Sequence, residues 1–226
     1  MKRKLIIILL TYSFFSCSES KTENFLNFSL EIPKKWNVYK LKGTDSYVRL
    51  ITTENNSKKL AELTDQIEGL DLLVLSSGMG DLNEDLNFEI ENKTNLLNVN
   101  AFTEIVDWTF NYFQKQGKGH LVAISSIAGI RGSRIAPAYN ASKAYQINYL
   151  EGLRQKAAKT KKPIYVTDIR PGFVDTDMAK GEGQFWVATK EKAAKQIFGI
   201  IKQKKGIGYV TKRSVSYTHL TLPTIC

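Results

Sequence analysis

Histidine and cysteine are the scarcest chemically reactive residues in this chain of 226 residues, which has only two of each. Cys17 and Cys226 lie at opposite extremes, and His120 and His219 are far apart in the sequence. No spacing typical of a zinc site or a disulfide framework is present. With only two histidines, the sequence also offers little basis for a Ser/His/Asp catalytic triad. We therefore expect no metal site in this protein.

Aromatic residues are absent from the most basic segments, although the net charge is +10. Lysines cluster at 156–162 and 202–205 without an interleaved aromatic side chain. Surfaces that bind single-stranded nucleic acid combine positive charge with aromatic rings on which bases stack. We therefore expect a solvated basic face and no nucleic-acid partner.

A long hydrophobic run is also missing. The apolar run over residues 5–15 is preceded by basic residues 2–4 and followed by Ser16 and Cys17. It is too short for a membrane span, which needs about 20 residues. Its layout is typical of a secretory signal, and "FFSC" resembles a bacterial lipoprotein signal with Cys17 as the lipidated residue. The alternative is a buried first strand, "KLIIILL", but no glycine-rich turn follows it, which favours the signal.

Residues 18–56 have a different pattern. The segment "LNFSLEI" (26–32) alternates apolar and polar residues up to Pro33. A period of two is typical of a half-exposed strand in an antiparallel sheet. Short apolar runs follow, and no segment of helical length separates them. We therefore expect no parallel βαβ unit in this part of the chain.

From residue 57 onward, amphipathic helices alternate with short apolar strands. This alternation predicts an α/β fold with a three-layer, Rossmann-like parallel sheet. In such sheets, ligands bind beyond the carboxyl ends of the strands. We expect helices at 57–70, 95–115, 138–158 and 189–203, strands at 71–76, 120–125, 163–169 and 207–211, and ligand-binding positions at 76–80, 126–130, 170–176 and after 212.

Tyr139 and Lys143 form the first candidate site. Pro137 suits the first turn of a helix, in which Tyr139 and Lys143 share one face as residues i and i+4. An ammonium beside a phenol favours the phenolate and lowers the phenol pKa from about 10. Such a tyrosine suits acid/base catalysis. Ser126, at the end of strand 120–125, is placed to hold a substrate oxygen, and a helix cap is its alternative role.

The turn "PGFVDT" (171–176) is the second candidate site. Pro171 and Gly172 force a turn and let the backbone approach a flat ligand. Val174 and Thr176 follow at positions where a backbone amide and a hydroxyl could hold an amide group. The alternative role of Thr176 is that of a helix N-cap.

Together, Ser126, Tyr139, Lys143 and "PGFVDT" resemble the short-chain dehydrogenase/reductase family over residues 57–213. That family has a serine thirteen residues before Tyr-x-x-x-Lys, followed by Pro-Gly-x-Val-x-Thr. The resemblance implies an oxidoreductase that uses NAD or NADP, with a small carbonyl or alcohol as substrate. It implies that Tyr139 is the acid/base, that Lys143 lowers its pKa and binds the nicotinamide ribose, and that Ser126 polarises the substrate oxygen.

Two other segments extend the resemblance. Asn100 in "NVNAF" matches the family's helix asparagine, which supports a water-mediated proton relay to the lysine; a polar helix-surface residue is the alternative. The segment "LVLSSGMG" (73–80) stands where the family has Asn-Asn-Ala-Gly, and Gly78 matches while Ser76 and Ser77 do not. The family also pairs subunits through the helices near 95–115 and 138–158, which implies a homo-oligomer. The expected cofactor contacts are Gly78, Tyr139, Lys143, Pro171, Gly172, Val174 and Thr176.

The family's glycine-rich loop, which follows its first strand, is missing here. Before Gly78 the only glycines are Gly43 and Gly69. In the family, the backbone amides of that loop and a helix dipole meet the cofactor pyrophosphate. We therefore expect the fold to lack its usual first βαβ half. Strand 71–76 would then be an exposed edge, and cofactor binding would be impaired.

These patterns divide the chain into a signal-like segment (1–17), a β-type lipoprotein-like segment (18–56), a partial reductase domain (57–213) and an irregular tail (214–226). The tail resembles a translated sequencing adaptor, which favours a chimera over a divergent protein with a replaced N-terminal half. The reductase body is expected in the cytoplasm, with membrane contact only through the first segment. The other hypotheses are a lipid-anchored envelope protein with a non-catalytic reductase-like body, and an inactive partner that assembles through its helices.

Overall fold

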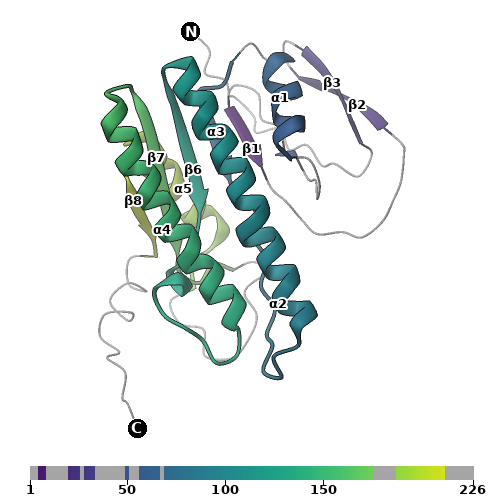
Figure 1. Cartoon of the computed structure of the whole chain (residues 1–226), viewed down its shortest axis with the longest axis vertical. Coiled ribbons are helices and arrows are strands. Elements are labelled where there is room, and N and C mark those ends of the chain that lie inside the picture. The colour runs from purple at the N-terminus through teal and green to yellow at the C-terminus, as the bar shows by residue number, and fades with distance from the viewer. Residues whose placement is uncertain are drawn as a thin grey trace.

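The computed structural model of the protein describes residues 5–8, 20–25, 28–33, 49–50, 56–66, 69–175 and 187–211. Its centre is a six-stranded sheet in which every neighbouring pair of strands is parallel (Figure 1). A separate antiparallel pair is formed by β2 (Ser20–Phe25) and β3 (Phe28–Pro33). In spatial order, the six strands are β4 (Arg49–Leu50), β1 (Leu5–Ile8), β5 (Leu72–Leu75), β6 (Gly119–Ile124), β7 (Ile164–Pro171) and β8 (Ile207–Val210).

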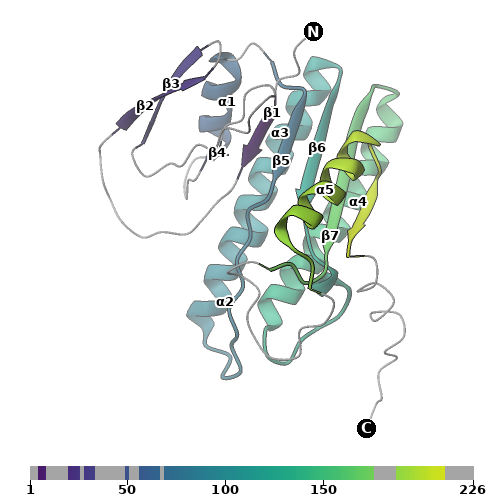
Figure 2. The ribbon, with the colours of Figure 1, turned by 180° about the vertical axis from the view of Figure 1, so that it is seen from behind.

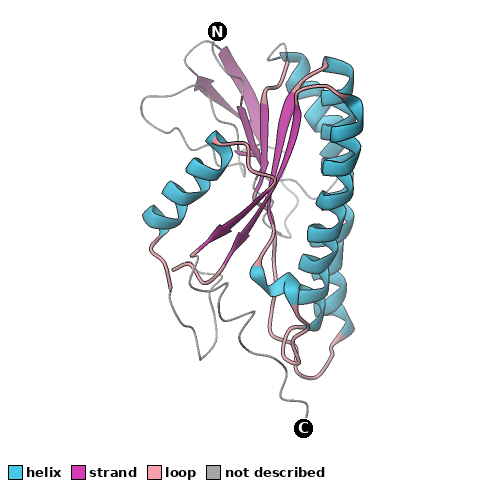
Figure 3. Cartoon of the chain, turned by 90° about the vertical axis from the view of Figure 1, so that its left-hand side faces the viewer, coloured by secondary structure: helices cyan, strands magenta, loops and turns pink. Residues whose placement is uncertain are grey.

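Helices cover the sheet on both faces. Helices α3 and α4 lie on one face, and α5 lies on the other, as the view from behind (Figure 2) and the view turned by 90° (Figure 3) show. The predicted three-layer, Rossmann-like parallel α/β fold is therefore confirmed. The helices are α1 (Asn56–Gln66), α2 (Phe88–Asn95), the π-helix η1 (Leu96–Ala101), α3 (Phe102–Gln116), the 3₁₀-helix η2 (Ile127–Ile130), α4 (Pro137–Thr160) and α5 (Lys190–Lys202).

Two apolar layers hold the sheet between its helices. Successive side chains of a strand point to opposite faces, so Leu73 and Leu75 join one layer and Val74 joins the other. The first layer includes Phe113 of α3 and Leu150 of α4. Burying a side chain of this size contributes about 1.5–3 kcal/mol. The apolar character of each predicted strand thus follows from its burial on both faces.

Strand β1 corrects the expectation that strand β5 forms an exposed edge of the sheet. Ile6 pairs with Leu73, and Ile8 pairs with Leu75, so β5 lies between β1 and β6 instead of forming an exposed edge. The described residues of "KLIIILL", Leu5–Ile8, therefore form a strand of the sheet, as in the alternative interpretation. The physical reason is that the backbone groups of β5 need hydrogen-bond partners, and the backbone of β1 supplies them. Cys17 and the tail 214–226 lie outside the described residues.

The segment 18–56 is partly as predicted. Strand β3 pairs antiparallel with β2 and ends at Pro33, which confirms the period-two pattern. Strand β4 adds a parallel pair that was not predicted, because Arg49 and Leu50 pair with Ile7 and Ile8 of β1. A parallel pair needs a long crossover, which is usually a helix. Here the described part of the crossover is the β2–β3 hairpin.

The largest difference among the helices concerns the predicted helix at 95–115. It begins at Phe88, where the side chain of Asn87 accepts a hydrogen bond from the Glu89 N–H and caps α2. The helical path then runs through the π-helix η1 into α3, which ends at Gly117 in the left-handed region. A π-helical turn holds more residues than an α-helical one, so it changes which side chains face the core.

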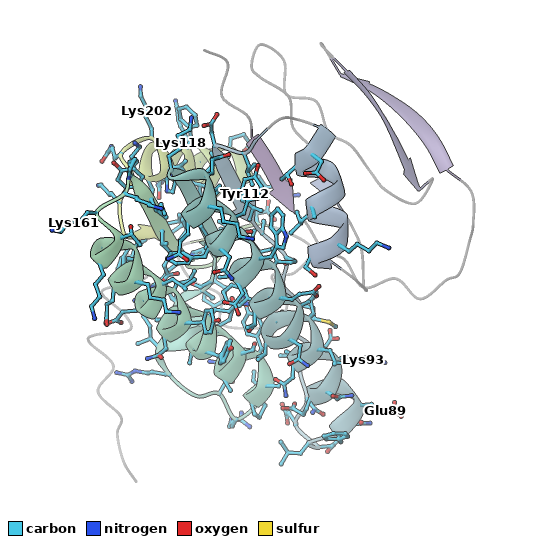
Figure 4. The ribbon with its side chains drawn as sticks, turned by 45° about the horizontal axis from the view of Figure 1, so that its top comes forward. Glu89, Lys93, Tyr112, Lys118, Lys161 and Lys202 are labelled. Atoms are coloured by element: carbon cyan, nitrogen blue, oxygen red, sulfur yellow. The ribbon has the colours of Figure 1, made fainter. Side chains whose placement is uncertain are left out.

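Three basic side chains lie away from the carboxyl ends of the strands. Lys118 precedes β6, Lys161 follows α4 and Lys202 ends α5, and all three side chains extend outward in Figure 4. Lys118 forms an ion pair with Asp71 at 3.1 Å. Within the described ranges, no helix is both long and apolar enough to cross a membrane.

Candidate active site

The carboxyl ends of β5, β6 and β7 bring three loops and the first turns of α4 together. Parallel strands end at the same edge of a sheet, so residues 76–80, 125–136 and 171–175 gather there (Figure 1). Helix α4 begins at Pro137, as its fixed φ angle favours. This start places Tyr139 and Lys143 on the face of α4 that meets these loops.

Ser126 is bound to Tyr139 and also caps a helix. Its hydroxyl hydrogen-bonds the phenol of Tyr139. Its Oγ accepts a hydrogen bond from the Ala128 N–H at 3.1 Å, which makes Ser126 the N-cap of η2. Asn140, next to Tyr139, donates to the carbonyls of Ala128 and Arg131 at 2.9 and 2.7 Å and holds this loop against α4. The helix-cap role that the sequence left as an alternative for Ser126 is therefore present, together with its contact with Tyr139.

The pKa of Tyr139 differs from the expectation. Burial raises the pKa of the phenol above its ordinary value, and the hydrogen bond from Ser126 lowers it by less. Lys143 Nζ lies 5.8 Å from the centre of the Tyr139 ring. The expected lowering by the ammonium is therefore wrong for this structure, because desolvation of the phenolate outweighs its stabilising contacts.

Lys143 is almost completely buried, with 3% of its surface exposed. Its Nζ donates to the carbonyl of Ile124 at 3.2 Å and to Oε1 of Gln146 at 3.0 Å. Burial lowers the pKa of Lys143 to about 8, and the nearby carboxylate of Asp168 acts in the opposite direction. A Cβ atom at Gly78 would lie 3.0 Å from Nζ, so the glycine leaves room beside the ammonium.

The structure places Asn98, not Asn100, at this site. Asn100 is exposed, whereas Asn98 is fully buried. The Asn98 side chain accepts from the Met79 N–H and donates to the Met79 carbonyl and to Ser142 Oγ, at 3.0, 2.7 and 2.9 Å. The helical spacing could have indicated Asn98, because it lies one turn after Thr94 and beside Leu97, and both of these residues are buried. The predicted Asn100 therefore lies away from these contacts, and Asn98 makes them.

The Pro-Gly turn leaves the sheet beside β8. Pro171 ends β7, and the Gly172 N–H donates to the Val210 carbonyl at 3.1 Å. Val174 forms an isolated parallel bridge with Ala188, at the start of the segment that leads into α5. The turn is thus held between the last strand and the last helix. Thr176 lies outside the described residues.

A buried charged pair beneath the site was not predicted. Asp168 is fully buried and accepts hydrogen bonds from Ser125 Oγ and from Arg170 Nε, the latter at 2.6 Å. Arg170 also donates to the hydroxyl of Tyr209 at 3.1 Å. The sequence feature that could have predicted this pair is the presence of opposite charges at i and i+2 of an apolar strand, where the two side chains share one face. Across the described residues, no three His, Cys, Asp or Glu side chains form a group suited to a metal ion.

Residues 45–185 match the sequence profile of the short chain dehydrogenase family, which covers more than half of the chain. The chain belongs to this family. An uncharacterized oxidoreductase of Mycobacterium tuberculosis is 31% identical over 157 residues, which are 68% of this chain and 61% of that protein. One of Staphylococcus epidermidis is 27% identical over 134 residues, 58% of this chain and 57% of that protein. The match therefore spans about three-fifths of these relatives' length.

Solved structures show the same fold. A short chain dehydrogenase/reductase from Burkholderia phymatum in complex with NAD has a TM-score of 0.67 at 17% identity, over 77% of this chain and 74% of that one. A short chain dehydrogenase from Burkholderia cenocepacia in complex with NADP has a TM-score of 0.64 at 16% identity, over 77% and 76%. At this level of identity the likeness concerns the architecture of the sheet and its helices.

Proposed function

We propose that this chain is an oxidoreductase that transfers a hydride between NAD or NADP and a small carbonyl or alcohol substrate. The observation that carries the proposal is the contact between Ser126 and Tyr139 above the buried Lys143, at the carboxyl end of a parallel sheet. Family membership and the two Burkholderia structures with bound NAD or NADP support it.

The residues beside Lys143 suit a cofactor. The ammonium of Lys143 has three N–H groups. Two of them donate hydrogen bonds to Ile124 and Gln146, so the third can donate to a ribose hydroxyl. Gly78 leaves space beside Nζ that a side chain would fill. Gly172, Val174 and Thr176 are the proposed contacts of the nicotinamide amide. The nicotinamide, when bound, supplies or accepts the hydride.

Tyr139 and Ser126 are proposed to act on one substrate oxygen. Because their side chains contact each other, both hydroxyls can reach the same carbonyl oxygen. Tyr139 donates its proton to that oxygen as hydride reaches the carbon, and Ser126 holds the oxygen by a hydrogen bond. The charge of Lys143 stabilises the phenolate that remains. Since burial raises the pKa of Tyr139, the protonated phenol favours carbonyl reduction over alcohol oxidation near neutral pH.

Cofactor affinity is expected to be low. No glycine lies between β1 and Gly43, so the chain has no glycine-rich loop after its first strand. In the family such a loop meets the pyrophosphate with backbone amides. We therefore propose that the contacts near Lys143 hold the nicotinamide end while the pyrophosphate is bound weakly.

Fluorescence titration of NADH and NADPH with the purified chain tests this function. The wild type and Tyr139→Phe should both bind cofactor saturably, because Lys143 and Gly78 remain in place in the variant. Turnover of a carbonyl panel by Tyr139→Phe should be about 10²–10⁴-fold slower. Tyr165→Phe, in β7 and remote from the site, is the control. Absence of saturable binding up to millimolar cofactor, or full activity of Tyr139→Phe, would refute the proposal.

A homo-oligomer paired through α3 and α4 is also proposed. Trp108 stacks on Tyr112 in α3, and Tyr145 stacks on Tyr149 in α4, with ring centres 5.2 and 5.5 Å apart. These four rings are partly buried against the core and partly exposed. Aromatic residues are enriched at protein interfaces. Light scattering that reports a monomer at micromolar concentration would contradict the pairing.

A further inference from the structure

Gln146 connects Lys143 to the π-helix η1. It lies one turn after Lys143 in α4 and has 1% of its surface exposed. Its Oε1 accepts a hydrogen bond from Lys143 Nζ at 3.0 Å, and its Nε2 donates to the main-chain carbonyl of Asn98 at 2.8 Å. A buried amide is unfavourable unless it is hydrogen-bonded, and both ends of this one are bonded.

The direction of the ammonium depends on these contacts. Two acceptors from different elements, the Ile124 carbonyl at the end of β6 and Gln146 of α4, hold Lys143 Nζ. Gly78, in the loop after β5, leaves the remaining side of Nζ open. Asn98 is in turn fixed to Met79 of that loop and to Ser142 of α4. Gln146 therefore completes a connection between α4, η1 and the loop beside the ammonium.

We propose that Gln146 is the positioning residue of Lys143, which keeps the buried ammonium charged and directed toward the space beside Gly78. The consequence for cofactor affinity rests on the proposed function, whereas the effect on the charge of Lys143 does not. The competing role for Gln146 is that of a core residue that only joins α4 to η1. The two roles differ in whether the protonation of Lys143 depends on residue 146.

The charged and titratable groups around Lys143 define this test. From its own helix Tyr139 faces it, and from β7 the carboxylate of Asp168 acts on it. The contacts from β6 and from Gln146 are uncharged. Because a hydrogen bond that accepts from an ammonium favours its charged form, loss of the Gln146 acceptor must lower the pKa of Lys143. A carboxylate in the same place must raise it.

NMR titration of the lysine Cε resonances of the full chain, without cofactor, measures this pKa. Lys143→Arg identifies the signal. Gln146→Met, which keeps the length of the side chain but not its hydrogen bonds, should lower the pKa of Lys143 by about one unit, a tenfold change in proton affinity. Gln146→Glu should raise it. Leu150→Ala, one turn further along α4 and fully buried, is the control: it should lower the Tm without moving this pKa.

The outcomes separate the two roles. Opposite shifts in Gln146→Met and Gln146→Glu support positioning, and if Gln146→Met does not fold, the upward shift in Gln146→Glu alone decides. A Lys143 signal that titrates as in the wild type in the folded Gln146 variants overturns the proposal. NADPH titration of the same proteins above pH 8 should show weaker binding by Gln146→Met, approaching about tenfold, because the protonated fraction of Lys143 falls by that factor there. If the wild type binds neither NADH nor NADPH, the proposed function fails, and the Lys143 titration still decides the role of Gln146.

Discussion

Gly80 lies against the ring of Tyr139, so closely that a Cβ atom at residue 80 would stand 2.3 Å from the ring carbon Cδ2. The ring that carries the candidate proton donor thus rests on bare backbone in the loop after β5. This contact, together with the hydrogen bond from Ser126, sets where the phenol oxygen lies.

We predict that Gly80→Ala displaces the Tyr139 ring and lowers turnover. A shift of about 1 Å in a catalytic group can cost about 10²-fold in rate. Steady-state kinetics measures this effect, and Gly132→Ala is the matched control because a Cβ atom there meets nothing within 4 Å. Equal turnover of the two variants would show that the ring position does not limit the reaction.

The buried pair of Asp168 and Arg170 predicts a large loss of stability in Asp168→Asn. The substitution leaves the buried guanidinium without the carboxylate that it contacts at 2.6 Å, and breaking a buried pair costs about 3–5 kcal/mol. Urea unfolding measures the change in the free energy of unfolding. The double variant with Arg170→Met should recover part of the loss, and strictly additive effects would contradict the coupling.

The lowered pKa of Lys143 leads us to predict that the free energy of unfolding rises with pH in the alkaline range. Its pKa is about 8 in the folded chain against an ordinary value of 10.5, so between these values the unfolded chain binds more protons. The free energy of unfolding therefore increases from about pH 8 to 10.5, by at most about 3 kcal/mol. Urea unfolding of the wild type and Lys143→Met measures the difference. The variant should lack the rise, and an identical pH profile in both would disprove a buried, titrating Lys143.

The lowered pKa of His120 leads us to predict that the fold loses stability in acid. Burial, with a smaller effect of Lys204, lowers the pKa of His120 to about 4 from 6.5. Thr167 Oγ1 donates to the Lys205 carbonyl and therefore accepts from His120 Nε2 at 2.8 Å. The unfolded chain binds more protons between pH 4 and 6.5, so stability falls by about 3 kcal/mol as the pH drops through this range. His120→Gln keeps a polar side chain without titrating. Its stability should fall less steeply in acid, as circular dichroism would detect.

Local patterns predicted the site residues that lie on one regular element. Tyr139 and Lys143 share a face because i and i+4 residues do so in any α-helix, and Pro137 marked its start. The sequence pointed to Asn100 and not to Asn98, because a π-helix shifts the buried face of the helix away from the position that a regular α-helical period predicts. Gln146 was missed because its two partners come from the ammonium of Lys143 and from a segment almost fifty positions away.

The sequence by itself determined the alternation of strands and helices, and with it the layered parallel sheet and the edge where Ser126, Tyr139 and Lys143 meet. Hydrophobic period and turn residues are local, so they carry this information directly. Only the tertiary structure decided that Leu5–Ile8 joins the sheet and that the pKa of Tyr139 rises instead of falling. Strand partners and burial arise from residues distant in the chain, and desolvation acts only once those residues have packed together.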